Sequence, residues 1–245
     1  MLSELLGSAD AILFVWALAS AALAFLLSAS AGLGGSLLLV PMLALLLGTK
    51  QGIATAALLL MGNNIAKVIA YRRTIPVRAV AAILILTIVG TAIGAQLLTA
   101  APESWVSIAI VATFIASFIG ERFGPTRLLR SSPLPLAFVA GVTSGFSGTS
   151  GPLKGVALRN LGLDRFNLVG AASAISLAGD AMKTAVFATA GLLDQTSWTL
   201  VILAIPIMAV ATACGRHINS RIGERAFTVL FWAVIAGYSA KLLVP

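Results

Sequence analysis

Long apolar runs, separated by short polar segments, recur along the whole chain. A helix needs about 20 mostly apolar residues to cross the hydrocarbon core of a bilayer. Such runs lie at roughly 11–29, 52–71, 77–99, 104–120, 166–190, 197–214 and 225–243, and a run rich in Pro and Gly at roughly 134–146 adds an eighth. Two more apolar segments, 37–48 and 152–162, are too short to cross as helices, since twelve residues rise only about 18 Å. The pattern predicts an all-α, polytopic transmembrane helical bundle with about eight long spans and two short segments.

Each short segment follows a break rich in glycine and serine. The breaks are Ser30-Ala31-Gly32-Leu33-Gly34-Gly35-Ser36 and Ser144-Gly145-Phe146-Ser147-Gly148-Thr149-Ser150-Gly151-Pro152. Gly32-Leu33-Gly34-Gly35 lines up with Gly145-Phe146-Ser147-Gly148, and Asn64-x-x-Lys67 lines up with Asp180-x-x-Lys183 after a shift of three residues. Self-similarity of this kind indicates an internal repeat. We therefore expect a single transporter domain over 1–245, built from one repeat at about 8–120 and a second at about 131–245.

Loop charges predict how the two repeats are oriented. If each break crosses the membrane together with its short helix, each repeat has five crossings and the repeats are inverted. All the arginines then fall on one side, and of the loop lysines Lys50 and Lys241 fall on the other. If the short segments re-enter without crossing, Lys and Arg divide almost evenly between the sides. Because cytoplasmic loops collect Lys and Arg, the first scheme is favoured, with both termini outside.

Composition agrees with a membrane protein and excludes several other classes. The chain is 59% hydrophobic with a mean hydropathy of +1.04, and only 10% of its residues are charged, against about a quarter in soluble domains. The net charge of +8 would suit a nucleic-acid binder, but membrane topology accounts for it. The N-terminus lacks the basic start of a signal peptide, so we expect the first run to be retained. Cys214 and His217 each lack a same-type partner, so we expect no disulfide, metal or cofactor.

The breaks are candidates for a substrate site. Non-helical backbone is tolerated at membrane depth only where protein buries it or where it lines a wet cavity. The helix after each break begins with unpaired N–H groups and a positive dipole end, which together attract anions. Paired broken helices in inverted repeats commonly hold the substrate at the midplane. The predicted site residues of the breaks are Gly32, Gly34, Gly35, Ser36, Gly145, Ser147, Gly148, Thr149 and Ser150. The alternative is that these small residues serve only close helix packing.

Ionisable residues inside the runs are the second set of candidates. Lys154 follows the second break, and Asp180 and Lys183 share one helix face deep in their run. We expect the lysines to face an anion and Asp180 to accept a proton, with a structural Asp180–Lys183 ion pair, or a permanent Lys154–Asp180 bridge, as the alternative. Asn63 and Asn64 either line the cavity or join helices by hydrogen bonds. Lys67 lies one turn from Arg72, so we expect it to reach the membrane interface.

These motifs resemble the TauE/SafE sulfite exporter family over nearly the whole chain. The residues that carry the resemblance are Gly32-x-Gly34-Gly35-(x)4-Val40-Pro41, repeated loosely as Ser144-Gly145-x-x-Gly148-x-x-Gly151-Pro152. The resemblance implies a multi-pass carrier in the bacterial inner membrane for small sulfur-containing anions such as sulfite or organosulfonates. The second motif departs from the family's usual run of glycines through Ser147, Thr149 and Ser150. It also has Lys154 where the first half has Pro41.

Three functions remain to be compared. The first is a secondary transporter that exports a sulfite-like anion, or else a carrier of another small anion or metabolite, with the bilayer as its surroundings and no nucleic-acid partner. The second is a membrane-embedded enzyme, which the scarcity of embedded nucleophiles and acids disfavours. The third is a subunit that does not itself transport. We expect a transporter and not an enzyme, and the sequence leaves open whether it forms a homo-oligomer.

Overall fold

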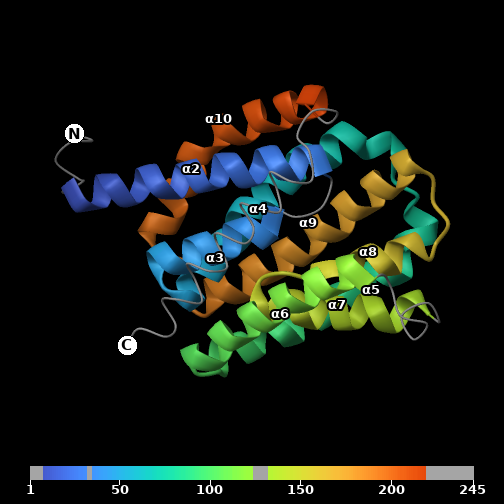
Figure 1. Cartoon of the computed structure of the whole chain (residues 1–245), viewed down its shortest axis with the longest axis horizontal. Helices are drawn as coiled ribbons and strands as arrows, with labels where there is room; N and C mark the ends of the chain where they lie inside the picture. Colours follow the sequence, from blue (N-terminus) through green and yellow to red (C-terminus); the bar gives the residue numbers. More distant parts are fainter. Residues whose placement is uncertain (1–7, 32–34, 124–131, 219–245) are drawn as a thin grey trace.

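The computed structural model describes residues 8–31, 35–123 and 132–218, and all regular structure in these ranges is helical (Figure 1). The elements are α2 (Ser8–Ala31), α3 (Gly35–Leu47), α4 (Thr49–Tyr71), the 3-10 turn η1 (Arg72–Thr74), α5 (Val77–Ala100), α6 (Glu103–Phe123), α7 (Pro133–Ser147), α8 (Gly151–Arg159), α9 (Arg165–Thr189) and α10 (Gln195–Ile218). Every predicted apolar run within the described residues is a helix. The two short segments are the short helices α3 and α8. The predicted run at 225–243 lies outside the described residues.

Two helical stretches are long and apolar enough to cross a bilayer by themselves, Thr49–Thr74 and Val77–Ala100. Further apolar helices of 10–17 residues lie in α2, α3, α6, α7 and α10. Many large apolar side chains on the outer faces are exposed, among them Trp16, Trp105 and Ile202. A fold that turns such side chains outward suits a lipid surround better than water. The all-helical prediction is confirmed, and the number of spans stays a prediction.

Helices α4 and α9 cross the middle of the bundle side by side and run antiparallel (Figure 1). Near the start of α4, Gln51 Nε2 donates to Asp194 Oδ2, just beyond the end of α9, over 2.7 Å. Further along both helices, Asn64 Nδ2 donates to Asp180 Oδ2, also over 2.7 Å. Residue numbers therefore rise along α4 as they fall along α9.

Helices α5 and α7 run parallel and pack through glycine. A Cβ atom added at Gly94 would collide with the backbone carbonyl of Val142, and one added at Gly145 would collide with that of Thr91. Gly90 and Gly141 are packed against opposing backbone in the same way. Small residues let helix backbones approach closely, and this close approach stabilises helix pairs in lipid, where apolar burial gives little driving force.

The bundle has two ends of different charge. At one end, Lys50 Nζ donates to the carbonyl of Thr99 over 2.9 Å. Asp194 also lies there, where burial would raise the pKa of its carboxyl, but hydrogen bonds from Ser197 and Gln51 outweigh burial and lower that pKa. At the other end, Gly170 of α9 lies against Thr74. Arginines at positions 72, 73, 78, 159 and 165 lie at that second end.

Candidate functional site

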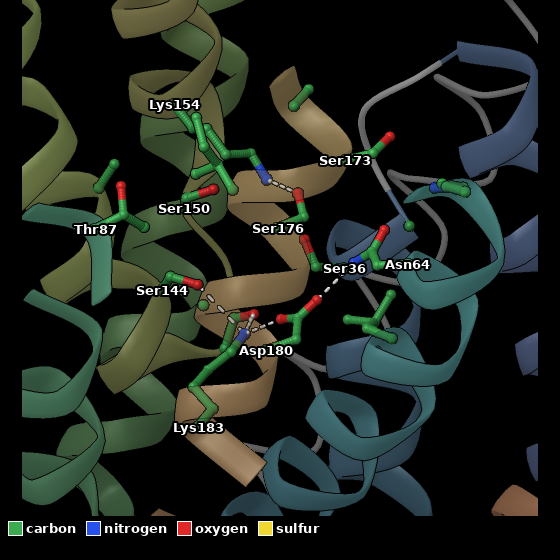
Figure 2. Close-up of a pocket in the computed structure, with 18 residues that line it drawn as sticks. Ser36, Asn64, Thr87, Ser144, Ser150, Lys154, Ser173, Ser176, Asp180 and Lys183 are labelled. Atoms are coloured by element: carbon green, nitrogen blue, oxygen red, sulfur yellow. Dashed lines mark hydrogen bonds and ion pairs between the residues drawn. The ribbon is translucent and has the colours of Figure 1, made fainter. Parts of the chain in front are cut away.

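A polar cavity of about 60 Å³ lies in the middle of the bundle, between α3, α4, α5, α7, α8 and α9 (Figure 2). The lining residues are Gly35, Ser36, Leu60, Asn64, Lys67, Thr87, Ala140, Ser144, Gly148, Ser150, Lys154, Ala172, Ser173, Ile175, Ser176, Gly179, Asp180 and Lys183. Both breaks contribute to this lining, through Gly35 and Ser36 from the first and Gly148 and Ser150 from the second. The lining combines three ammonium groups, one carboxylate and several hydroxyls. Such a surface is chemically suited to a small charged or strongly polar molecule.

Asp180 is the centre of the polar contacts between α4 and α9. Its Oδ1 lies 2.7 Å from Lys183 Nζ one turn along α9, and its Oδ2 accepts from Asn64 Nδ2 over 2.7 Å. All three side chains are buried. The predicted Asp180–Lys183 ion pair is therefore present, and Asn64 joins two helices at the cavity wall.

Lys183 also connects α9 to the second break. Its Nζ donates to Ser144 Oγ and to the carbonyl of Gly148, each over 3.3 Å. Gly148 ends α7 with φ +81°, a left-handed conformation that side chains disfavour. A Cβ atom there would also come within 2.9 Å of Val40. The glycine is thus required both by its backbone angle and by its closeness to α3, and it turns its carbonyl to Lys183.

Lys154 lies in the first turn of α8 and reaches the other wall of the cavity. Its Nζ donates to Ser176 Oγ over 2.7 Å (Figure 2). The hydrogen-bond partner of Lys154 is thus a neutral hydroxyl, while Asp180 pairs with Lys183. The structure does not contain the alternative that was predicted, a permanent Lys154–Asp180 bridge. The two carboxylate oxygens of Asp180 instead contact Lys183 and Asn64.

The two breaks meet. Ser36 Oγ, in the first turn of α3, lies 3.0 Å from Thr149 Oγ1 in the second break. Ser147 is buried beside this contact, where it accepts from Thr113 Oγ1 over 3.1 Å and donates to the carbonyl of Thr143 over 2.9 Å. Ser36 and Ser150 line the cavity, whereas Thr149 and Ser147 stand behind it. The hydroxyls of the second break are thus divided between the cavity surface and its support.

The position of the Lys67 side chain differs from the one expected from the sequence. Its closeness in sequence to Arg72 suggests a side chain that reaches the membrane interface. In the structure Lys67 is buried, with 8% of its surface exposed, and it lines the cavity. The reason is tertiary: α9 runs antiparallel beside α4 and covers the face that carries both Asn64 and Lys67. The signal for this role is the alignment of Asn64-x-x-Lys67 with Asp180-x-x-Lys183.

Besides Ser147 and Thr149, two more of the predicted site residues lie outside the cavity lining. Gly145 belongs to the glycine contact between α7 and α5, because the helix runs on to Ser147 before it breaks. Asn63 is fully buried, and its side-chain amide has no hydrogen-bond partner within the described part of the chain. Gly32 and Gly34 fall outside the described residues.

Besides Lys67, four polar lining residues are absent from the predicted site residues: Thr87, Ser144, Ser173 and Ser176. Ser173 and Ser176 precede Asp180 and Lys183 on α9 at spacings of three, four and three residues. This spacing places all four side chains on one helix face. A polar stripe of this kind in an apolar run is the signal that identifies Ser173 and Ser176. Thr87 and Ser144 have no comparable local signal.

The cavity has an excess of positive charge. Lys67, Lys154 and Lys183 line it against the single carboxylate of Asp180. The described residues contain no group of three His, Cys, Asp or Glu side chains that could hold a metal ion. With lysines and hydroxyls as donors, the cavity is suited to an anion with several oxygen acceptors.

A family model described as Sulfite exporter TauE/SafE matches residues 17–242 of the chain. The matched region contains every residue that lines the cavity. No curated protein and no solved structure matches the chain.

Proposed function

Because the chain belongs to the TauE/SafE family of sulfite exporters, and is therefore a membrane transporter, we propose that its central cavity carries a small oxyanion. The substrate is sulfite or an organosulfonate, and the direction is outward across the bacterial inner membrane. The observation that carries this proposal is the cavity itself, with three lysines against one carboxylate. Membrane proteins place such costly charges where they meet a partner or a pathway.

The cavity's size favours the smallest members of this substrate class. A cavity needs about 10–15 Å³ of space open to the centre of a water molecule in order to hold one. The 60 Å³ present here therefore fits roughly four groups of that size. Sulfite, a sulfur atom with three oxygens, matches this space. A longer organosulfonate requires the cavity to widen.

Two contacts support the proposed inverted repeat. Asn64 lines up with Asp180 and Ser36 lines up with Thr149, and the members of each aligned pair touch one another. Equivalent residues of two repeats touch in this way close to a two-fold axis. Helix pairs agree: α2 packs on α10 and α5 packs on α7, so the first helix of each repeat packs on the fourth of the other. We place the substrate on this axis, near the membrane midplane.

The antiparallel pair α4 and α9 supports the proposed topology. Each of them is the third helix of its repeat. The two helices run in opposite directions only if the second break, together with α8, crosses the membrane. Positions 72, 73, 78, 159 and 165 then lie at the cytoplasmic end, as the positive-inside rule requires. Single cysteines are introduced at Arg73 and at Lys50 after Cys214 is replaced. On intact cells, an impermeant thiol reagent should label the cysteine at position 50 and leave the one at position 73 unlabelled. Labelling at Arg73 and protection at Lys50 would reverse the orientation.

Export of an anion needs no ATP under this proposal. The cytoplasm is electrically negative, so expelling one negative charge gains about 2.3 kcal/mol per 100 mV. Asp180 adds a site for proton coupling, since protonation of its carboxyl would release Lys183 from the ion pair to meet the substrate. The substrate and the ionised Asp180 carboxylate then compete for the same ammonium group, so protonation of Asp180 favours substrate binding.

The test is transport by purified protein in proteoliposomes loaded separately with sulfite, sulfate, thiosulfate, sulfoacetate and taurine. An inside-negative potential should drive sulfite efflux above that of empty liposomes, and taurine, which carries no net charge, should leave slowest. Efflux of another anion with no sulfite efflux would favour the alternative, a carrier of a different small anion. The absence of any efflux from protein of confirmed fold would reject the carrier proposal.

A further inference from the structure

The net charge of the cavity identifies the ionic form of its ligand, on the premise that the proposed function is correct. Three lysines and one aspartate line the described cavity, so with all four groups ionised their charges sum to two positive units. The sum does not depend on which ammonium group pairs with the carboxylate. It holds equally whether Asp180 keeps Lys183, as here, or exchanges partners when the ligand enters.

Within the described part of the chain, no acidic residue besides Asp180 lines the cavity. Asp10 and Glu103 lie in the first turns of their helices, and Glu121 lies in the last turn of α6. Asp164 and Asp194 precede α9 and α10 at the ends of the bundle. The N-terminus of α8, where Lys154 lies, adds a further positive potential.

We propose that the cavity selects a doubly charged oxyanion over a singly charged one of the same shape. A dianion loses more hydration on entry than a monoanion does, so a neutral or singly positive cavity would favour the monoanion. A cavity with two excess positive charges offsets that loss, because each ligand charge meets an ammonium group at short range in a poorly screened interior. Lys67 and Lys154, which bring two of the three ammonium groups to the lining, are the specificity-determining residues whose removal tests the proposal.

The ligand pair that isolates charge is sulfite and methanesulfinate, in which a methyl group replaces one charged oxygen of the same pyramidal anion. Calorimetric titration of the purified protein with each ligand, at neutral pH and with the sulfite constant corrected for its doubly charged fraction, gives two dissociation constants. Sulfite should bind at least ~10-fold more tightly, as expected for a charge-assisted hydrogen bond gained at the third oxygen. Comparable affinity for both ligands would overturn the proposal and leave the proposed function intact.

A charge-removing variant separates charge from size. In Lys67→Gln the preference should fall to about threefold or less, because one ammonium is gone while the cavity keeps its shape. Lys154→Gln, at a position that is only partly buried, provides the same test if Lys67→Gln does not fold. Lys50→Gln removes an equal charge at the end of the bundle and should keep the full preference. A preference that survives in both cavity variants would show that size selects the ligand and would overturn the proposal. If wild-type protein binds neither ligand, the proposed function fails as well.

Discussion

The contact between α5 and α7 is made of glycine and backbone, whereas the contact between α4 and α9 is made of charged and amide side chains. In the first, Gly94 and Gly145 face opposing backbone with no space for a Cβ atom. In the second, Asn64 of α4 donates a hydrogen bond to Asp180 of α9, and Asp180 also forms an ion pair with Lys183 on its own helix. Both contacts lie within the apolar helices of one bundle.

The comparison distinguishes the residues that stabilise the bundle from the residues that are available to bind its ligand. In lipid, close packing through small residues stabilises helix pairs without polar groups. Charged side chains at the same depth cost free energy and are kept where they act. We infer that the glycine contact is a rigid frame and that the polar contact is the working surface. Substitutions in the frame should therefore affect folding, and substitutions in the working surface should affect the ligand.

The largest expected effect comes from adding one methyl group to the frame. In Gly94→Ala the new Cβ collides with the carbonyl of Val142, and backbone in a packed helix pair cannot move aside cheaply. Overpacking costs about 1–3 kcal/mol or more. The yield of monodisperse protein and its midpoint of thermal unfolding should both fall sharply.

Gly179→Ala is the matched control for that substitution. Gly179 is also in a helix, but its added Cβ would meet only Thr91 Oγ1 and Thr87 Cγ2, at 3.6 and 3.9 Å. The thermal midpoint of this variant should be unchanged or slightly higher, since alanine favours a helix over glycine by about 1 kcal/mol. Equal midpoints for the two variants would contradict the distinction between frame and working surface.

The next largest effect is on binding alone. Lys154→Met should insert and fold, because its hydrogen-bond partner is the single hydroxyl of Ser176, yet it should bind sulfite at least ~10-fold more weakly, a loss of about 1.4 kcal/mol. Calorimetry and thermal unfolding on the same preparation separate the two effects. Lys50→Met at the end of the bundle is the control and should bind normally. Unchanged sulfite affinity in well-folded Lys154→Met would remove this residue from the site.

Most of the frame could be predicted from the sequence, and the working surface only in part. Apolar run length determined the helices, and glycine-rich breaks located α3 and α8, because these signals depend on local composition. The sequence predicts the wrong surroundings for Lys67, since its burial depends on α9, which is distant from it in the chain. Gly145 was assigned to the site for a similar reason: helix packing and helix breaking use the same residue, and only the partner helix distinguishes them. Thr87 reaches the cavity purely through tertiary packing.

Asp180→Asn should change binding in the opposite direction from Lys154→Met. Loss of the carboxylate charge removes a repulsion worth ~1 kcal/mol, so sulfite should bind about fivefold more tightly. If Asp180 couples protons, the flux of this variant should also lose its dependence on pH. Weaker binding accompanied by a lower thermal midpoint would instead assign Asp180 a purely structural role, the ion pair with Lys183.

Ser176→Ala should give the smallest effect. Its hydroxyl accepts from Lys154 over 2.7 Å and positions the ammonium, so its loss removes one hydrogen bond worth about 0.5–1.5 kcal/mol and lets the lysine side chain move. Sulfite affinity should fall about threefold, and the double variant with Lys154→Met should bind no more weakly than Lys154→Met alone. Additive losses would mean that Ser176 acts on the ligand independently of the lysine.

The most direct test of the central claim, that the cavity holds the transported anion, is to locate an anion in the protein. Selenite has the pyramidal shape of sulfite, and its selenium atom gives an anomalous diffraction signal. Crystals grown with selenite, at a concentration that competes with sulfite transport, should show one strong peak in the cavity between Ser36, Lys67 and Lys154. A peak elsewhere in the bundle, or an empty cavity at that concentration, would contradict the account.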